Sequence, residues 1–155
     1  MPCDVGFDHK LYYNSATHAS PTWVEVAQIG DVSADVLRRL AEVLVRESRW
    51  PGNCVGSFDA TITFPMLYNP GGTAFDALRT MFFADGTSAE KQFYIADGDS
   101  GTNGTQGLRI ACVMENFPWK SNLNSPSMID QVTLRPSYFE ESGSRVTPDW
   151  YTISA

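Results

Sequence analysis

The stretch "SFDATITFPM" (57–66) limits the possible folds of this chain more than any other segment. Its apolar residues occupy every second position, and polar residues stand between them. The apolar set is Phe58, Ala60, Ile62, Phe64 and Met66, and the polar set is Asp59, Thr61 and Thr63. A side-chain period of two is typical of a β-strand with one buried face. We therefore expect a sheet in which this strand is half buried.

Further strands are predicted at short intervals, since β-branched and aromatic runs alternate with Gly, Pro, Asn and Asp. They cover residues 10–14, 22–30, 90–98, 107–117 and 127–137. The last two are expected to form a hairpin with a longer loop. With 155 residues the chain fits one domain, and residues 138–155 are expected to pack as a C-terminal extended arm.

One helix is predicted directly after "NPGG" (69–72). Phe75, Leu78 and Phe82 form a stripe with helical spacing, supplemented by Met81. Thr73 is expected to cap the free amides, with Asp76 completing a shortened capping box. The helix should end at "ADG" (84–86), where Gly86 can adopt a left-handed conformation.

The strand, glycine turn and helix follow each other in the order used by phosphate-binding loops. Such a loop needs a lysine at the helix start, as in GxxxxGK[ST], and "NPGGTAFD" contains none. Asp76 also places a carboxylate at the positive end of the helix. We interpret the segment as a plain strand-to-helix turn.

Residues 33–50 allow two interpretations. Val36, Leu37, Leu40 and Leu44 match helical spacing, and this favours a helix. Val43 and Val45 also alternate with their neighbours, which suits a strand. The residue pattern alone leaves helix or strand open.

No catalytic, cofactor-binding or metal site is predicted. Asp97 and Asp99 form a calcium-like DxD, but Leu108 stands where an EF-hand requires a bidentate Glu, so we expect a surface loop. His9 and His18 are expected to be exposed imidazoles. Glu140 and Glu141 are interpreted as solvated charge. No GxSxG elbow is present, although a triad assembled in space stays possible on sequence grounds.

Charge and cysteine content exclude other classes of protein. The net charge of −7 repels polyanions, so tight wrapping of nucleic acid is not expected. Cys54, Cys112 and Cys3 form no CxxC pair, which suits a reducing compartment rather than a disulfide framework. No apolar run approaches the ~18 residues that a membrane helix needs. We expect no membrane association, no cofactor and synthesis in the cytoplasm.

Aromatic and arginine residues at element ends point to self-association. The candidate contacts between subunits are Arg46, Arg49, Trp50, Phe117 and Trp119. Aromatic residues and Arg are enriched in protein interfaces, although these aromatics could equally cover the core. Residues 46–56 are expected to form a loop that becomes ordered on docking, and Arg38 and Arg39 add to the positive cluster.

The order of these features resembles the tail tube, or major tail, proteins of long-tailed bacteriophages and prophages. The resemblance covers roughly residues 5–140 and rests on an ordered series of short motifs. They are "LYY", "W..V..IGDVS", "AEV.VRESRW", "GSFDATITFPMLYN", "AFDALRTMFF", "IADG", "QGLRIACVMENF" and "MIDQVTLRPS".

The resemblance implies a mainly β fold, a β-sandwich of two packed antiparallel sheets with one flanking helix. It implies a strand followed by a long loop at 33–50. The "LRRL" insert departs from the family pattern, which leaves a helix open for part of this segment. Functionally it implies a structural subunit and no enzyme: six copies form a ring, rings stack into a tube, and DNA passes through the lumen without specific binding. Tape measure, tail tip and tail terminator proteins are the implied partners, in the virion tail after assembly in the host cytoplasm.

Two other classes remain open. One is the tube protein of a related contractile injection or type VI-like secretion system. The other is a monomeric β-sandwich binding module or small hydrolase, in which the aromatics would form a ligand platform.

Overall fold

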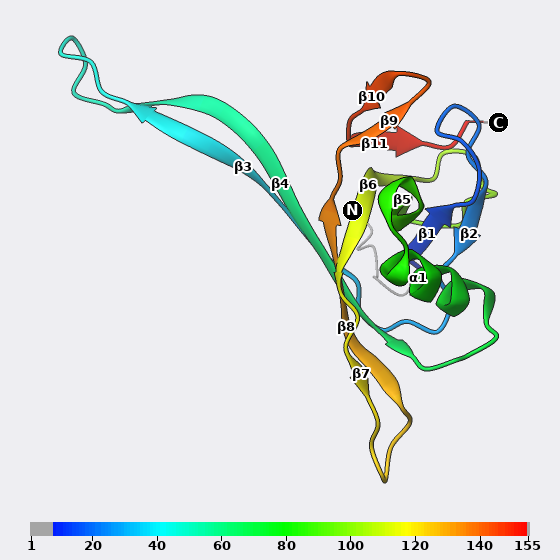
Figure 1. The fold of residues 1–155 in the computed structure, drawn as a ribbon. Helices are drawn as coiled ribbons and strands as arrows, with labels where there is room; N and C mark the ends of the chain where they lie inside the picture. Colours follow the sequence, from blue (N-terminus) through cyan, green and yellow to red (C-terminus); the bar gives the residue numbers. More distant parts are fainter. Residues whose placement is uncertain (1–7, 155) are drawn as a thin grey trace.

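The computed structural model describes residues 8–154 of the chain, so Cys3 lies outside the described residues. A body carries most of the strands and the helix, and a long hairpin projects from it (Figure 1). The elements are β1 (Lys10–Asn14), β2 (Trp23–Glu25), β3 (Ser33–Val43), β4 (Gly52–Leu67), α1 (Thr73–Phe83), the 3₁₀ turn η1 (Gly86–Ala89), β5 (Glu90–Ala96), β6 (Gln106–Asn116), β7 (Trp119–Lys120), β8 (Met128–Pro136), β9 (Phe139–Glu141), β10 (Ser144–Val146) and β11 (Asp149–Thr152).

Most strands belong to one curled antiparallel sheet. Its order is β2-β1-β5-β6-β8-β4-β3, with β11 added on β6 and β7 added on β8, while β9 and β10 form a separate pair. The predicted mainly β fold with one flanking helix is confirmed. The two expected layers are joined through β6 and β8 into a continuous sheet that folds around the core.

The core lies between this curled sheet and α1. From β4 it takes Ala60, Ile62, Phe64 and Met66, which are at most 4% exposed, as the alternation predicts. The helix contributes Phe75, Leu78 and Met81 of its predicted stripe, whereas Phe82 is only half buried, and β5, β6 and β8 supply the rest. These further residues include Phe75, Leu78, Met81, Phe93, Ile110, Cys112, Ile129, Val132 and Leu134. Phe58 was expected to continue the buried face and does not, since it is 66% exposed.

The helix begins at Thr73, one residue earlier than a Thr73 cap would require. Gly72 is the N-cap and makes no side-chain cap, so the prediction of Thr73 as the capping residue is wrong. The Asp76 carboxylate instead accepts a hydrogen bond from the Gly71 N–H at 3.3 Å. The helix ends at Phe83, and Gly86 has the expected positive φ of 63°.

Residues 33–50 form the strand that the tail tube resemblance implied, but the loop after it is short rather than long, and the alternative of a helix is wrong. β3 pairs with β4 from Ser33↔Thr63 to Val43↔Gly52, and the "LRRL" segment is strand throughout. Long-range pairing here overrides helical spacing. Because β4 already begins at Gly52, residues 52–56 are strand and the predicted loop at 46–56 is shorter than expected.

A bulge interrupts the β3–β4 pairing between Arg38 and Leu40. At this point β4 carries one residue more than β3, and Gly56 approaches the opposite backbone closely. A Cβ at position 56 would lie 2.8 Å from the Arg39 carbonyl oxygen. Only glycine therefore fits without a local shift, and the bulge increases the twist of the hairpin.

A second, smaller cluster attaches the C-terminal residues to the body. Tyr12 and Tyr94 pack with Trp23 and Tyr151 on the sheet face away from the main core. β11 pairs with β6, and Arg109 donates two hydrogen bonds to Asp149 at 2.8 and 2.6 Å. Residues 149–152 are thus extended and paired with β6, while residues 139–146 form the separate β9–β10 hairpin.

Candidate functional site

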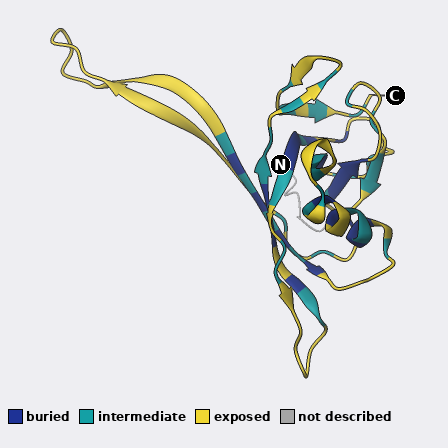
Figure 2. Ribbon diagram, in the orientation of Figure 1, coloured by how far each residue is buried: buried dark blue, intermediate teal, exposed yellow. Residues whose placement is uncertain are grey.

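The hairpin of β3 and β4 beyond the body, residues 36–58, is here called the arm. Every residue from 33 to 58 is exposed, and burial begins only where β4 enters the body (Figure 2). An isolated two-stranded hairpin is at best marginally stable in water. The arm therefore has the composition and exposure of an element that needs a partner surface.

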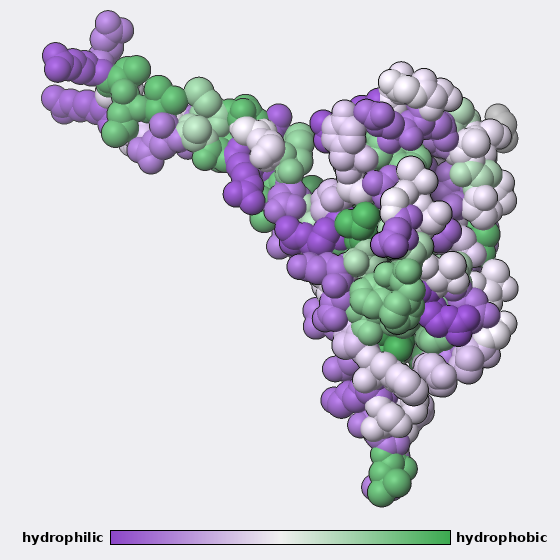
Figure 3. Space-filling view, viewed as in Figure 1, coloured by the Kyte–Doolittle hydropathy of each residue, from purple (hydrophilic) through white to green (hydrophobic). Residues whose placement is uncertain are grey.

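One face of the arm carries four exposed apolar residues in its half nearer the body, with Arg38 beside them and the polar pair Glu42↔Asn53 beyond them. Val36, Leu40, Val55 and Phe58 are 49%, 61%, 58% and 66% exposed. The pairs Val36↔Ala60, Arg38↔Phe58 and Leu40↔Val55 place them on the face that, nearer the body, covers the core. Figure 3 shows apolar residues gathered along the arm. A group of exposed apolar residues of this kind marks an interaction site.

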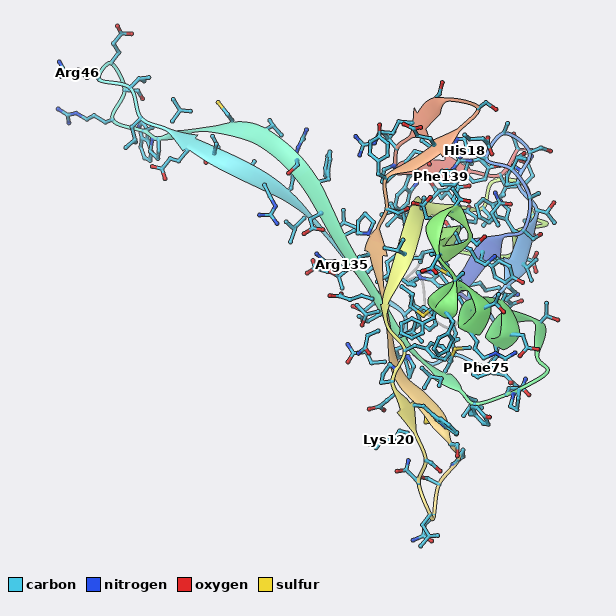
Figure 4. All side chains as sticks on the ribbon, viewed as in Figure 1. His18, Arg46, Phe75, Lys120, Arg135 and Phe139 are labelled. Atoms are coloured by element: carbon cyan, nitrogen blue, oxygen red, sulfur yellow. The ribbon has the colours of Figure 1, made fainter. Side chains whose placement is uncertain are left out.

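The tip of the arm carries three of the predicted contact residues. Trp50 is 83% exposed. Its backbone N–H donates a hydrogen bond of 3.1 Å to the Ser48 hydroxyl oxygen. Arg46 lies at the far end, away from the body (Figure 4). Within residues 8–154, Arg46 and Arg49 have no ion-pair partner.

The structure divides the predicted arginine cluster. Arg38 lies over the Phe58 ring, 4.6 Å from its centroid, and Arg39 pairs with Asp59 at 3.5 Å. These two arginines are bound within the subunit at the root of the arm, and the two at the tip are available to another molecule.

The outer edge of β3 is a second unsatisfied feature. In the described part of the chain β4 is its sole partner strand, so an eleven-residue edge presents free backbone N–H and C=O groups. Long free edges readily pair with strands of other chains.

Phe117 and Trp119 lie elsewhere, at the end of β6 and in β7. Phe117 is half buried, with ring centroids 6.0 Å from Phe75 and 5.7 Å from Phe82, so it covers the core. Trp119 is 65% exposed and stacks on Tyr68 at 5.1 Å. The hairpin of β7 and β8 projects from the opposite end of the body to the arm (Figure 1).

Sequence reasoning missed the tip of that second hairpin. Leu123 is 98% exposed there. An apolar residue between Asn122 and Asn124 could have been read as a contact residue, but a single leucine in a polar loop is a weak signal.

Two residues interpreted as exposed or solvated are bound instead. The Glu141 carboxylate accepts hydrogen bonds from the backbone N–H of His18 at 2.7 Å and of Ala19 at 3.3 Å. The His18 ring is half buried, with Nδ1 2.7 Å from Gln92 Nε2. These predictions were wrong because β9 and the loop after β1 are brought together by the fold and not by sequence proximity.

The Asp97 and Asp99 carboxylates stabilise their own turn. Asp97 accepts from the Gln106 N–H at 2.9 Å, and Asp99 accepts from the Gly101 N–H at 2.8 Å. That hydrogen bond, followed by the charge of Lys10, lowers the pKa of Asp99. In residues 8–154 no group of three or more His, Cys, Asp or Glu residues could hold a metal ion.

One hollow of about 700 Å³ lies beside β1 and residues 25–32. Its Lys10 pairs with Glu25 and with Asp99, both at 3.5 Å, and the Glu25 carboxylate is the main cause of the raised pKa of Lys10. This lysine is a charged, paired group rather than a nucleophile or base. Across the described residues, no helix has the length and apolar character needed to span a membrane.

Solved structures resemble most of the chain, with TM-scores between 0.61 and 0.69 for three of them. A chain of the tail of an empty gene transfer agent particle, with C6 symmetry, is 13% identical with a TM-score of 0.68 and covers 87% of this chain and 95% of its own. The SPP1 tail tube is 10% identical with a TM-score of 0.69 and covers 97% and 80%.

The third is a chain of the sheath–tube complex of an extracellular contractile injection system, PVC, in the extended state. It is 11% identical with a TM-score of 0.61 and covers 95% of this chain and 90% of its own. No protein-family model matches the chain, and the comparison with curated proteins returns no match. The fold is that of phage tail tube proteins.

Proposed function

We propose that this chain, which has the tail tube fold, is a structural subunit of a phage tail tube. Six copies form a ring, and rings stack into a hollow tube through which DNA passes. The observation that carries the proposal is the arm: an exposed hairpin with an uncovered apolar face, unpaired arginines at its tip and a free strand edge. Another copy of the same chain would cover the apolar face, pair with the arginines and form hydrogen bonds with the free strand edge.

The subunit acts as a single tail tube domain over residues 1–155, with 138–155 as its C-terminal arm, and it has no catalytic role. Its partners in the virion tail are the tape measure, tail tip and tail terminator proteins, and it is held in the host cytoplasm before assembly.

Docking of the arm is concentrated at its tip. Trp and Arg are the residue types that carry most interface energy when they become buried. Trp50 is nearly free of intrachain contact, and the acidic surface of a second copy, with the chain at −7 overall, supplies partners for Arg46 and Arg49. In the free subunit the tip is expected to exchange its amide hydrogens quickly and to slow on assembly.

The test combines Trp50→Ala with Arg49→Glu. Loss of such an anchor typically costs about 2 kcal/mol or more per interface, and the contact repeats around every ring. We expect a folded subunit with an unchanged thermal midpoint that no longer forms tubes in negative-stain images.

The matched control is Trp150→Ala with Arg145→Glu. It removes an exposed tryptophan, 68% accessible, and reverses an arginine on the body instead of the arm. Tubes from the control and none from the arm variant support the proposal. Normal tubes from the arm variant contradict it, and so does an equal loss in both.

A related function is favoured by the similarity to the contractile injection complex. The chain would then form the inner tube of such a system. Neighbouring sheath, spike or effector genes would indicate that role, and tape-measure and tail-chaperone genes would indicate a phage tail.

A further inference from the structure

The sheet face opposite the core forms a polar surface across β3, β4 and β8, here called the outer strand face. The pairs Leu37↔Asp59 and Asp35↔Thr61 join β3 to β4, and Thr63↔Thr133 joins β4 to β8. Its members are Asp35, Leu37, Arg39, Asp59, Thr61, Thr63, Thr133 and Arg135. Apart from Leu37 they are polar, in contrast to the apolar face of the arm.

Asp59 stands between the two arginines of this face. Its carboxylate is 3.5 Å from Arg39 and 3.3 Å from Arg135. Arg135 also donates a hydrogen bond of 2.6 Å to the Thr61 hydroxyl. Arg135 lies where the arm leaves the body (Figure 4). Asp35 adds a second carboxylate, so positive and negative charges on the face are equal in number.

The position of the core decides which way this face points in a tube. If strand edges of neighbouring copies join, the wall of the conduit is the sheet itself. The opposite face of the sheet is covered by the core and α1, which would fill the conduit if they lay inside. The outer strand face is therefore the one that can line an open lumen.

We propose that the outer strand face lines the conduit. We propose also that Asp59, by pairing with Arg39 and Arg135, keeps these two side chains from binding the DNA that passes through. This inference rests on the proposed function. A free guanidinium binds phosphate through paired hydrogen bonds, and several such contacts make DNA binding strong and salt-dependent. A wall that repeats two arginines in every subunit would retain the duplex, and a wall whose arginines are held by a carboxylate lets it slide.

The first test determines which way the face points. Single cysteines are placed at Thr63 on the outer strand face and at Thr80 on α1, in a chain carrying Cys3→Ser and Cys54→Ser. Buried Cys112 remains. In free subunits, a maleimide attached to a polymer wider than the conduit should label both sites.

In assembled tubes the polymer should label T80C but not T63C, while N-ethylmaleimide reaches both. Polymer labelling of T63C in tubes overturns the assignment. Tube formation itself, scored first by negative stain, tests the proposed function separately.

The second test concerns the charge. Asp59→Asn tubes should retain a short DNA duplex in co-sedimentation at low salt about ten-fold more than parent tubes, with the excess lost at high salt. Asp76→Asn is the matched control, because Asp76 also pairs with an arginine, Arg79 at 3.1 Å, but on α1.

Adding Arg39→Gln and Arg135→Gln to Asp59→Asn should return DNA retention to the parent level. Equal retention by the Asp59→Asn and Asp76→Asn tubes overturns the proposal, as does retention that persists in the triple variant. The labelling test decides the orientation of the face even where Asp59→Asn subunits do not assemble.

Discussion

Strand β4 is continuous, but its two halves have different surroundings. Phe58 and Phe64 are the same residue type on the same face of one strand, yet they are 66% and 1% exposed. Phe64 pairs with Val132 of β8, and both are part of the core that packs against α1. Phe58 pairs only with Arg38 of β3, and no third strand lies beside it in the described chain.

The comparison shows that an alternating pattern specifies a face without specifying what covers it. Where β4 runs through the body, other segments of the same chain cover its apolar residues, and these residues stabilise the fold. Where β4 runs through the arm, no segment of the subunit covers its apolar residues, so they are available for assembly. Substitutions in the two halves should separate stability from tube formation.

The largest contrast is expected between Phe64→Ala and Phe58→Ala. The first leaves a cavity in the core and should lower the free energy of unfolding by about 3–5 kcal/mol. The second removes an exposed ring and should change it by no more than about 0.5 kcal/mol. Denaturant unfolding of both free subunits measures the difference. A loss below about 1 kcal/mol for Phe64→Ala would show that the buried face is assigned wrongly.

Alkaline pH should weaken the body through two buried acids. Burial raises the pKa of Tyr94 to about 12 and that of Cys112 to about 12, from ordinary values of 10.0 and 9.0. Because the neutral forms are favoured in the folded state, this stability is fully present below about pH 9 and is lost as the pH rises toward 12.

At about 1.4 kcal/mol per pKa unit, the full loss should be on the order of 3 kcal/mol for Tyr94 and 4 kcal/mol for Cys112. Unfolding measured between pH 8.5 and 11.5 tests the slope. Tyr94→Phe should reduce the slope above pH 10, and an unchanged slope would mean that Tyr94 does not titrate with folding.

The smallest effect is expected within the arm. Gly56→Ala places a Cβ 2.8 Å from the Arg39 carbonyl oxygen, whereas at Gly52 the nearest atom would be 3.8 Å away. Gly56→Ala should therefore destabilise the arm by about 1–2 kcal/mol, and Gly52→Ala should have little effect. Amide exchange of residues 36–58 measures this, with the body amides unchanged. Equal exchange in both variants would show that the bulge tolerates a side chain.

The sequence by itself determined the elements whose patterns are local. The alternation from Ala60 to Met66, the helical stripe of Phe75 and Leu78, and the hairpin of 107–117 with 127–137 all appear as predicted. In these segments propensity, period and turn residues agree, and the chain covers the faces that they define.

Only the tertiary structure decided the rest. Residues 33–50 are a strand because β4 pairs with them, although their spacing also suits a helix. Phe58 is exposed because β8 does not reach it, and His18 is bound because Glu141, distant in sequence, is folded beside it. The physical reason is common to all three: periodicity is a property of neighbouring residues, while burial and pairing depend on which distant segments, or which other subunits, come to lie against them.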